Sequence, residues 1–241
     1  TNGGAVNNAL SKWVDIVTWG GFLLITGYAI GMLYEKKEKY FKELSQTYQG
    51  IITMLSLVVD SVDKYTQNHS YRVSKYAERM ANAAHLSESE TEDIRIAALL
   101  HDLGKIGVSA EILNKIGGLS EEERKEMSSH TKKAEDILDP LGGRVLSILP
   151  LIINHHERHD GNGYNSLMGD SIPIGAKIIA VADVYDALTT DRPYRKALTP
   201  LEGRDEIIKG SGTHFDPETV MYFEQVFPTL DDIDEPLISH A

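Results

Sequence analysis

The apolar residues of this chain recur at three- and four-residue intervals, and this spacing restricts the fold more than any other feature. It is clearest between Ile51 and Met80, where the period is that of a helix. The alternation that marks strands is weak throughout, and turns are indicated at 117–118, 142–143 and 161–163. We therefore predict an all-α fold, in which 241 residues with 41% apolar content bury a real core.

An uncharged, strongly apolar segment extends from Ile16 to Tyr34. Its length approaches the roughly 20 residues that cross a bilayer as a helix, and the lysines of 35–39 suit a cytoplasmic flank. We expect a membrane helix with its N-terminus outside, continued by one long helix into a domain. The alternative is a buried or dimerising helix of a soluble protein, because Asp15 and several glycines lower the hydrophobicity.

These patterns divide the chain into four parts. We expect a tail and membrane helix over 1–34, a helical linker over 35–54, a helical-bundle domain over 55–230 and a tail over 231–241. The first residue is Thr rather than Met, and we interpret the chain as a fragment with a further domain upstream.

Two serines mark predicted helix starts within the domain. Ser87 is followed three residues later by Glu90, and Ser120 by Glu123, which is the spacing of a capping box. Met127, His130, Ala134 and Ile137 would then follow one face of the helix that begins near Ser120.

A further helix is expected from Ile174 to Leu188, and it is apolar almost all round, which predicts burial. It nevertheless carries Asp183 and Asp186. A buried carboxylate needs a cation or hydrogen-bond donors, so this helix is expected to face something positively charged.

Composition excludes several classes of site. The chain has no cysteine, so disulfides, thiolate metal sites and thiol nucleophiles are excluded, and any metal must be held by nitrogen and oxygen. A net charge of −12 disfavours a protein that follows a nucleic-acid polymer. A small anionic ligand remains compatible with cations clustered locally.

The domain also carries histidines and aspartates at the ends of, or within, its apolar helical runs. They are His69, His101, Asp102, His130, His155, His156 and Asp183. Each histidine alone is more often a core or surface residue than a ligand. Together they have the pattern by which a helical bundle builds an internal metal site from several helices.

Four stretches show that this pattern resembles a known family. They are His101-Asp102-Leu103-Gly104-Lys105-Ile106-Gly107, His155-His156-Glu157-Arg158-His159-Asp160-Gly161-Asn162-Gly163-Tyr164, Val181-Ala182-Asp183-Val184-Tyr185-Asp186-Ala187-Leu188 and Arg192-Pro193-Tyr194-Arg195. The chain resembles the HD-GYP domain family over roughly Leu55 to Phe227. The first stretch is typical of all HD phosphohydrolases, and the second is typical of the cyclic-dinucleotide branch.

The resemblance implies that the domain is an HD-type helical bundle that hydrolyses cyclic di-GMP to pGpG, and onward to GMP if a second cleavage follows. It implies that the seven histidines and aspartates above are metal ligands, with Asp102 as the bridge between two ions. Tyr65 stands where trinuclear relatives carry a glutamate, so we expect two divalent ions rather than three. Nitrogen and carboxylate ligands suit iron or manganese.

Four side chains are candidate substrate contacts. Lys105 would meet phosphate oxygens or the leaving group, or else be a solvated lysine at a helix end. Tyr164 would pack on a guanine, or else anchor its loop. Arg192 and Arg195, three residues apart, would bind one phosphate or else form surface ion pairs.

The loop after the second stretch departs from the family. Asn165 replaces the proline of the Gly-Tyr-Pro signature, which removes a fixed backbone angle and puts loop rigidity and partner choice in question. Glu157, His159 and Asp160 are candidates for orienting ligand imidazoles rather than for binding metal.

Three functions are compatible with the sequence. The first is a cyclic di-GMP phosphodiesterase at the bacterial plasma membrane, with its catalytic domain in the cytoplasm, or a cytoplasmic enzyme if 16–34 does not span. The second is a signalling module that binds cyclic di-GMP or a partner protein without turnover. The third is a phosphohydrolase of another nucleotide. A homodimer and signalling-protein partners are compatible with each.

Overall fold

The structure is a computed structural model that describes residues 3–62, 68–115, 117–191 and 195–233, with side chains considered from 11 to 230. Within these ranges all regular secondary structure is helical, apart from isolated bridge residues such as the pair Ser211 and Phe215. The all-α prediction is therefore confirmed. The chain divides into two compact units, residues 1–51 and 52–241.

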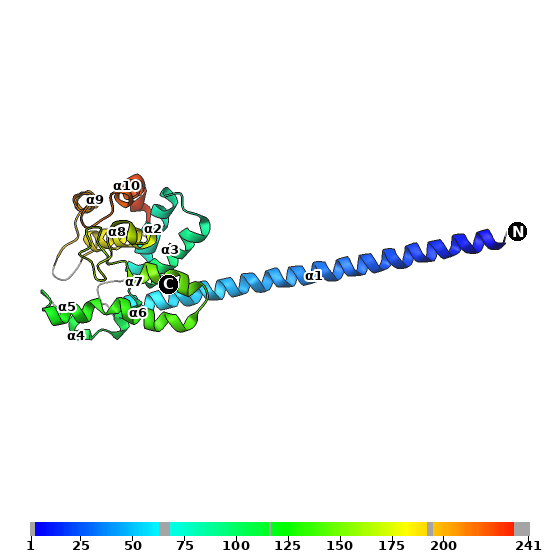
Figure 1. Ribbon diagram of the computed structural model, residues 1–241, viewed down its shortest axis with the longest axis horizontal. Helices are drawn as coiled ribbons and strands as arrows, with labels where there is room; N and C mark the ends of the chain where they lie inside the picture. The colour runs from blue at the N-terminus through cyan, green and yellow to red at the C-terminus, as the bar shows by residue number, and fades with distance from the viewer. Residues whose placement is uncertain (1–2, 63–67, 116, 192–194, 234–241) are drawn as a thin grey trace, which may run out of the picture. The chain divides into compact units, whose positions relative to one another are not determined.

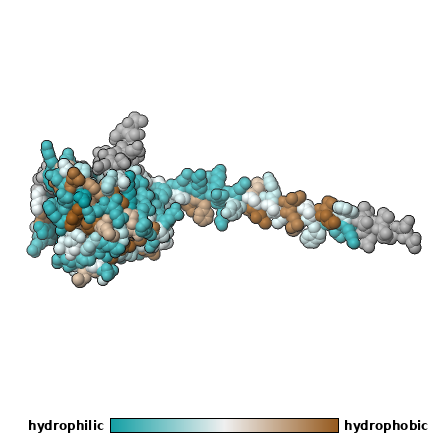
Figure 2. Space-filling model, turned by 90° about the horizontal axis from the view of Figure 1, so that it is seen from above, coloured by the Kyte–Doolittle hydropathy of each residue, from teal (hydrophilic) through white to brown (hydrophobic). Residues whose placement is uncertain are grey.

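Helix α1 runs without interruption from Gly3 to Val62. It contains a stretch that is long and apolar enough to cross a membrane, and none of that stretch is buried. Figure 2 shows apolar residues along the N-terminal part of this helix, followed by hydrophilic ones. The prediction of one long helix through the linker is confirmed, and the described helix then ends before α2.

The core of the second unit is a bundle in which α2 packs against α3 and α8, and α7 packs against α3 and α6 (Figure 1). The bounds of these helices are α2 His69–Ala83, α3 Glu88–Leu100, α6 His130–Leu138, α7 Arg144–Ile153 and α8 Ile174–Thr189. Helix α8 is the most enclosed, with Ile178, Ile179 and Val181 fully buried. Its predicted burial is therefore confirmed.

Further elements surround this bundle. They are η1 Leu103–Gly107, α4 Ala110–Leu113, α5 Glu121–Ser128, η2 Asp139–Leu141, η3 Gly169–Ser171, α9 Pro200–Lys209, α10 Pro217–Val226 and η4 Phe227–Ile233. Both predicted capping boxes are present, because Ser87 caps α3 with Glu90 and Ser120 caps α5 with Glu123. These reciprocal bonds satisfy backbone N–H groups that a helix start leaves without partners.

The predicted single helix after Ser120 is wrong, because it divides at Ser129 into α5 and α6. The hydroxyls of Ser128 and Ser129 donate to the carbonyl oxygens of Lys125 and Glu126, and such local bonds compete with helix continuation. The break leaves His130 buried at the start of α6, whereas Ile137, expected on the same face, is 43% exposed.

Candidate metal centre

The seven predicted ligands come together from five parts of the bundle. His69 is the first residue of α2, and His130 is the first residue of α6. His101 and Asp102 follow directly after α3, the His155-His156 pair follows α7, and Asp183 lies within α8. Six of the seven therefore lie at or just beyond a helix end, and Asp183 lies within a helix.

The side chains form two groups, in each of which the ligand atoms lie within 4.8 Å of one another. We call His69, His101 and Asp183 the acidic group, because His69 also contacts further carboxylates. We call Asp102, His130, His155 and His156 the imidazole group. Each group offers the nitrogen and oxygen donors that divalent first-row metals accept.

Asp102 lies between the two groups. Its Oδ2 is 3.4 Å from Nε2 of His101, and its Oδ1 is 3.8 Å from Nε2 of His130. The two oxygens of one carboxylate therefore face histidines of different groups. This is the geometry that a carboxylate needs to bridge two ions.

Three of the histidines are fixed by the helical turn before them. Nδ1 of His101, His130 and His155 donates to the carbonyl oxygen three residues earlier, at 2.7, 2.7 and 2.6 Å. A carbonyl can only accept, so Nδ1 carries a proton, and in the neutral ring the lone pair is on Nε2. These bonds orient each ring and set its tautomer, as is usual for histidines that bind metal.

The Nε2 atoms of the same three rings are buried and have no hydrogen-bond partner among the described residues. A buried polar atom without a partner costs on the order of 1–3 kcal/mol. Three such lone pairs directed into one region are consistent with metal coordination, which would satisfy all of them. On this observation the residues present fit divalent cations.

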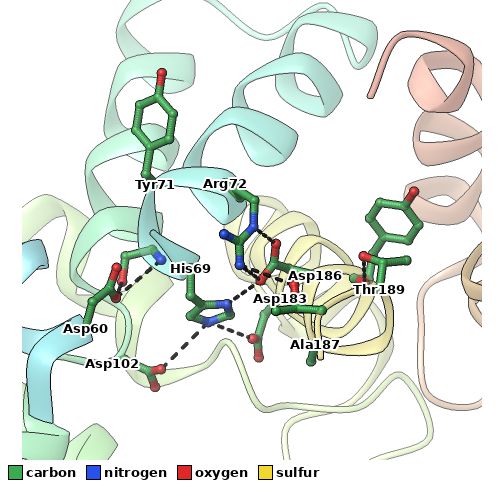
Figure 3. Close-up of polar contacts among 12 residues, drawn as sticks. Asp60, His69, Tyr71, Arg72, Asp102, Asp183, Asp186, Ala187 and Thr189 are labelled. Carbon is green, nitrogen blue, oxygen red and sulfur yellow. Dashed lines mark hydrogen bonds and ion pairs between the residues drawn. The ribbon is translucent and has the colours of Figure 1, made fainter. Parts of the chain in front are cut away.

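His69 is oriented differently, by side chains (Figure 3). Its Nδ1 lies 2.7 Å from Asp186, and Arg72 contacts the same carboxylate at 2.5 Å and 2.9 Å. Its Nε2 lies 3.3 Å from Asp183. The sequence pointed to Asp186 as a buried carboxylate in need of a cation, but it did not single out Arg72, which follows His69 by one helical turn.

The protonation of the two groups differs. Burial lowers the pKa of His155 and His156, that of His156 to about 3, and lowers the pKa of His130 as well. Burial also opposes a charge on His69, but its bonds to Asp183 and Asp186 outweigh this and raise its pKa to about 10. Without metal, the imidazole group is neutral at its histidines, and the acidic group contains a cationic imidazolium.

Lys105 is placed on the bridging carboxylate, with Nζ 2.6 Å from Asp102 Oδ2. Burial raises the pKa of Asp102, but the positive charges of protonated His101 and of the Lys105 ammonium outweigh it and hold this pKa well below its usual range. The solvated-lysine alternative does not describe this arrangement, because the Lys105 side chain is only 17% exposed.

Gly104 allows η1 to approach α6 closely. A Cβ at this position would collide with the backbone oxygen of His130 and lie 2.7 Å from the backbone nitrogen of Ala134. Both atoms belong to the backbone of α6, which cannot move aside. The glycine therefore brings Asp102 and His130 within reach of each other.

The loop after His156 is held by Glu157, whose carboxylate accepts from the backbone N–H of Asn165 at 2.6 Å and of Leu167 at 2.8 Å. The Asn165 amide also donates to the carbonyl of Ile153 at 3.2 Å. Proline has no N–H, so the signature proline could not make the first bond. Asn165 thus replaces a fixed backbone angle by hydrogen bonds.

Tyr164 is positioned by this loop beside the imidazole group. Its ring centre lies 4.8 Å from that of His156 and 6.3 Å from that of His130, while 46% of the residue stays exposed. An aromatic face at the edge of the candidate metal centre is available to a ligand.

Other candidates lie elsewhere. Arg195 donates to the carbonyl oxygens of Ala187 and Leu188 at the end of α8. Arg192 and Tyr65 lie outside the described residues. Glu157 holds the loop rather than an imidazole, and Asp160 pairs with Arg158.

The chain is similar to known proteins in both sequence and fold. A family model described as an HD domain matches residues 51–219. The chain is 36% identical over 222 residues to the 3'3'-cGAMP-specific phosphodiesterase 2 of Vibrio cholerae, covering 87% of this chain and 42% of that protein. It is 34% identical over 204 residues to a cyclic di-GMP phosphodiesterase of Thermotoga maritima, covering 84% and 55%.

The cyclic di-GMP phosphodiesterase response regulator RpfG of Xanthomonas campestris is 36% identical over 180 residues, covering 74% of this chain and 48% of that protein. The chain thus spans about half the length of these relatives or less.

A solved cyclic GMP-AMP phosphodiesterase of V. cholerae has a similar fold, with a TM-score of 0.60 at 20% identity over 77% of this chain and 50% of that one. The fold, the family match and these relatives agree with one another. The chain belongs to the HD-domain family, and it is a member of the HD-GYP type.

Proposed function

We propose that residues 55–230 form a phosphodiesterase domain that hydrolyses a cyclic dinucleotide with two divalent cations. The observation that carries this proposal is the set of three buried, unpartnered Nε2 atoms beside a carboxylate whose oxygens face two ligand groups. Two bound cations would lower the pKa of a shared water and offset the negative charge that develops on the phosphate oxygens.

In this proposal the acidic group holds one cation and the imidazole group holds the other, with Asp102 shared between them. Iron and manganese are the expected ions, because both accept imidazole and carboxylate ligands. The chain supplies no thiol nucleophile, since it has no cysteine. Its residues would bind the cations, fix the imidazole tautomers and position the phosphodiester.

The substrate contacts are expected at the edge of this centre. Lys105 carries a positive charge next to Asp102, where a non-bridging phosphate oxygen would be held. Tyr164 would stack on a base, since its exposed ring lies against His156. Arg192 and Arg195 remain proposed phosphate contacts, although Arg195 donates to the end of α8 in this structure.

Cyclic di-GMP is the proposed substrate, with pGpG as the first product and GMP as the product of a second cleavage. The second candidate is 3'3'-cGAMP, because relatives of similar identity carry that specificity in their names. The two dinucleotides differ in one base, so the phosphate chemistry of the site would serve either of them.

We also propose that residues 16–34 attach the domain to the bacterial plasma membrane, with 35–54 as a helical linker. The length, apolar character and exposure of this part of α1 support a span. The lysines that follow favour a cytoplasmic position for the domain.

Metal analysis of the purified chain, combined with chromatography of its reaction products, tests the proposal. We expect about two ions per chain and linear products from cyclic di-GMP, 3'3'-cGAMP or both. The His101→Ala variant should lose turnover and metal. His85→Asn is a matched control, because His85 is exposed and its backbone has a positive φ that asparagine tolerates.

Binding of either dinucleotide without turnover by the fully metal-loaded chain would instead support a signalling module. No binding of either nucleotide and no metal would contradict the proposal altogether.

A further inference from the structure

A second apolar stripe extends along α1, apart from the residues that this helix buries. Ile52, Ser56, Val59 and Asp60 are buried, which accounts for one face of its C-terminal part. On another face, Phe41, Leu44, Ile51 and Val58 are 66%, 67%, 48% and 44% exposed. Within the described residues these four side chains stay exposed.

The stripe follows a seven-residue repeat. Position a is occupied by Tyr34, Phe41, Tyr48, Leu55 and Val62, and position d by Lys37, Leu44, Ile51 and Val58. A strict 3.5-residue period kept over four such repeats is the pattern of a left-handed coiled coil. A helix that only covers a globular core keeps the 3.6-residue period instead.

The segment around the stripe is polar. Between 35 and 50, positions b, c and f hold charged or polar residues and glycine, so only one face offers apolar contact. Lys39 and Glu43 on that polar side pair with each other within the helix, at 3.8 Å. One stripe can accommodate one partner helix.

We infer that this stripe is a parallel, in-register coiled-coil interface with α1 of a second copy of the chain. The apolar positions a and d are self-complementary, because each would meet the same residue of the other copy. Lys37 is the one polar residue among them. Its charge would be met by Glu38 at position e, which flanks position d of the opposite helix in a parallel pair.

The size of the stripe is at the lower end of what a specific dimer needs. Eight apolar side chains occupy positions a and d, of which Tyr48, Leu55 and Val62 are already half-buried and five are exposed. If each of the five exposed side chains loses on the order of 100 Å² in a helix pair, two copies bury roughly 1,000 Å², which is near the lower limit for a specific protein interface.

Position a of the repeat continues upstream into the apolar segment, where Gly27 and Gly20 each precede the next position a by seven residues. A Cβ added at either glycine would meet nothing within 4 Å, so these sites are open. In apolar surroundings, glycine on one helix face lets two helices approach closely. The upstream glycines therefore extend the same face, independently of the apolar side chains.

Cysteine cross-linking tests this interface without a background from native thiols, because the natural chain has no cysteine. Single cysteines would be placed at each position from 40 to 51 of the full chain in detergent micelles, and the covalent dimer measured after mild oxidation. Leu44→Cys, at position d, and Gln46→Cys, at position f, form a matched pair because both are exposed in the same helical turn.

We expect strong cross-linking at 41, 44, 48 and 51 and at least tenfold less at 43, 46 and 50. Uniform cross-linking, or none at any position, would overturn the interface. Cross-linking confined to one or two neighbouring positions would indicate antiparallel helices and also overturn it.

A second measurement covers the case in which oxidation itself distorts the helix. The molecular mass of the chain in micelles, from sedimentation, should correspond to two copies and fall to one in the Phe41→Glu/Leu44→Glu double variant. The Lys42→Glu/Gln46→Glu variant should keep the mass of two copies. A monomeric natural chain at micromolar concentration would contradict the proposal, whatever the hydrolase assays give.

Discussion

The acidic group and the imidazole group offer similar ligand atoms but hold them in different ways. In the imidazole group, His130 and His155 are oriented by carbonyls of their own helical turns and stay neutral. In the acidic group, His69 is oriented by Asp186, which Arg72 clamps in turn. Local backbone therefore orients His101, His130 and His155. His69 of the acidic group depends instead on long-range side-chain contacts that a single substitution can remove.

The largest effect is expected from the residue that the groups share. Asp102→Ala should reduce turnover of cyclic dinucleotide by on the order of 10³-fold or more, about 4 kcal/mol of transition-state stabilisation, because both ions lose a ligand. Steady-state rates and metal content would be measured together. Loss of one ion only, with the other fully retained, would show that Asp102 does not bridge.

Asp186→Asn should affect the acidic group alone. Removing the charge that orients His69 is expected to weaken the binding of one metal ion by about 10–100-fold, as for other carboxylates that hydrogen-bond to a metal-binding histidine. A metal titration should then separate into one tight and one weak step. Asp136→Asn is the control, since the Asp136 side chain is 66% exposed, and equal weakening of both steps would remove the distinction between the groups.

Asn165→Pro should affect only the edge of the imidazole group. The variant restores the family signature, but it removes the backbone N–H of residue 165 that donates a hydrogen bond to the Glu157 carboxylate. We therefore expect a loss of about 1–3 kcal/mol of folding stability. KM for the dinucleotide should rise because Tyr164 is held less firmly, while metal affinity stays unchanged. A more stable variant with unchanged KM would contradict the role given to the Asn165 hydrogen bonds.

The last prediction concerns the pH dependence of the stability of the metal-free protein rather than turnover. The pKa of His156 falls from 6.5 to about 3 on folding, so its contribution to stability is lost as pH falls from 6.5 towards 3. The pKa of His69 rises from 6.5 to about 10, so its contribution is present below 6.5 and is lost as pH rises to 10. Each slope is at most about 1.4 kcal/mol per pH unit.

Denaturant unfolding of the metal-free chain between pH 5 and 9 measures both slopes. His156→Gln should flatten the acid side, and His69→Gln should flatten the alkaline side. If His156→Gln flattened the alkaline side and His69→Gln flattened the acid side, the protonation states would be assigned to the wrong groups.

Sequence reasoning was most effective where function depends on residue type at a fixed spacing. The seven histidines and aspartates were proposed from their places in helical runs and from motif resemblance, and all of them lie in the two groups. Helix starts at Ser87 and Ser120 followed from local capping chemistry, which needs no tertiary information.

The remaining features depend on geometry that spacing does not encode. Arg72 reaches Asp186 from a different helix, and Glu157 accepts backbone donors that are visible only once the loop is folded. The break at Ser129 was missed because the apolar spacing continues across it, although two adjacent serines are a recognisable signal.

Crystals of the chain soaked with Mn²⁺ and measured for anomalous scattering would test the central claim most directly. Two separate peaks are predicted, one bound by His69, His101 and Asp183 and the other by His130, His155 and His156, with Asp102 contacting both. A single peak, or peaks away from these side chains at full metal occupancy, would contradict the two-cation centre.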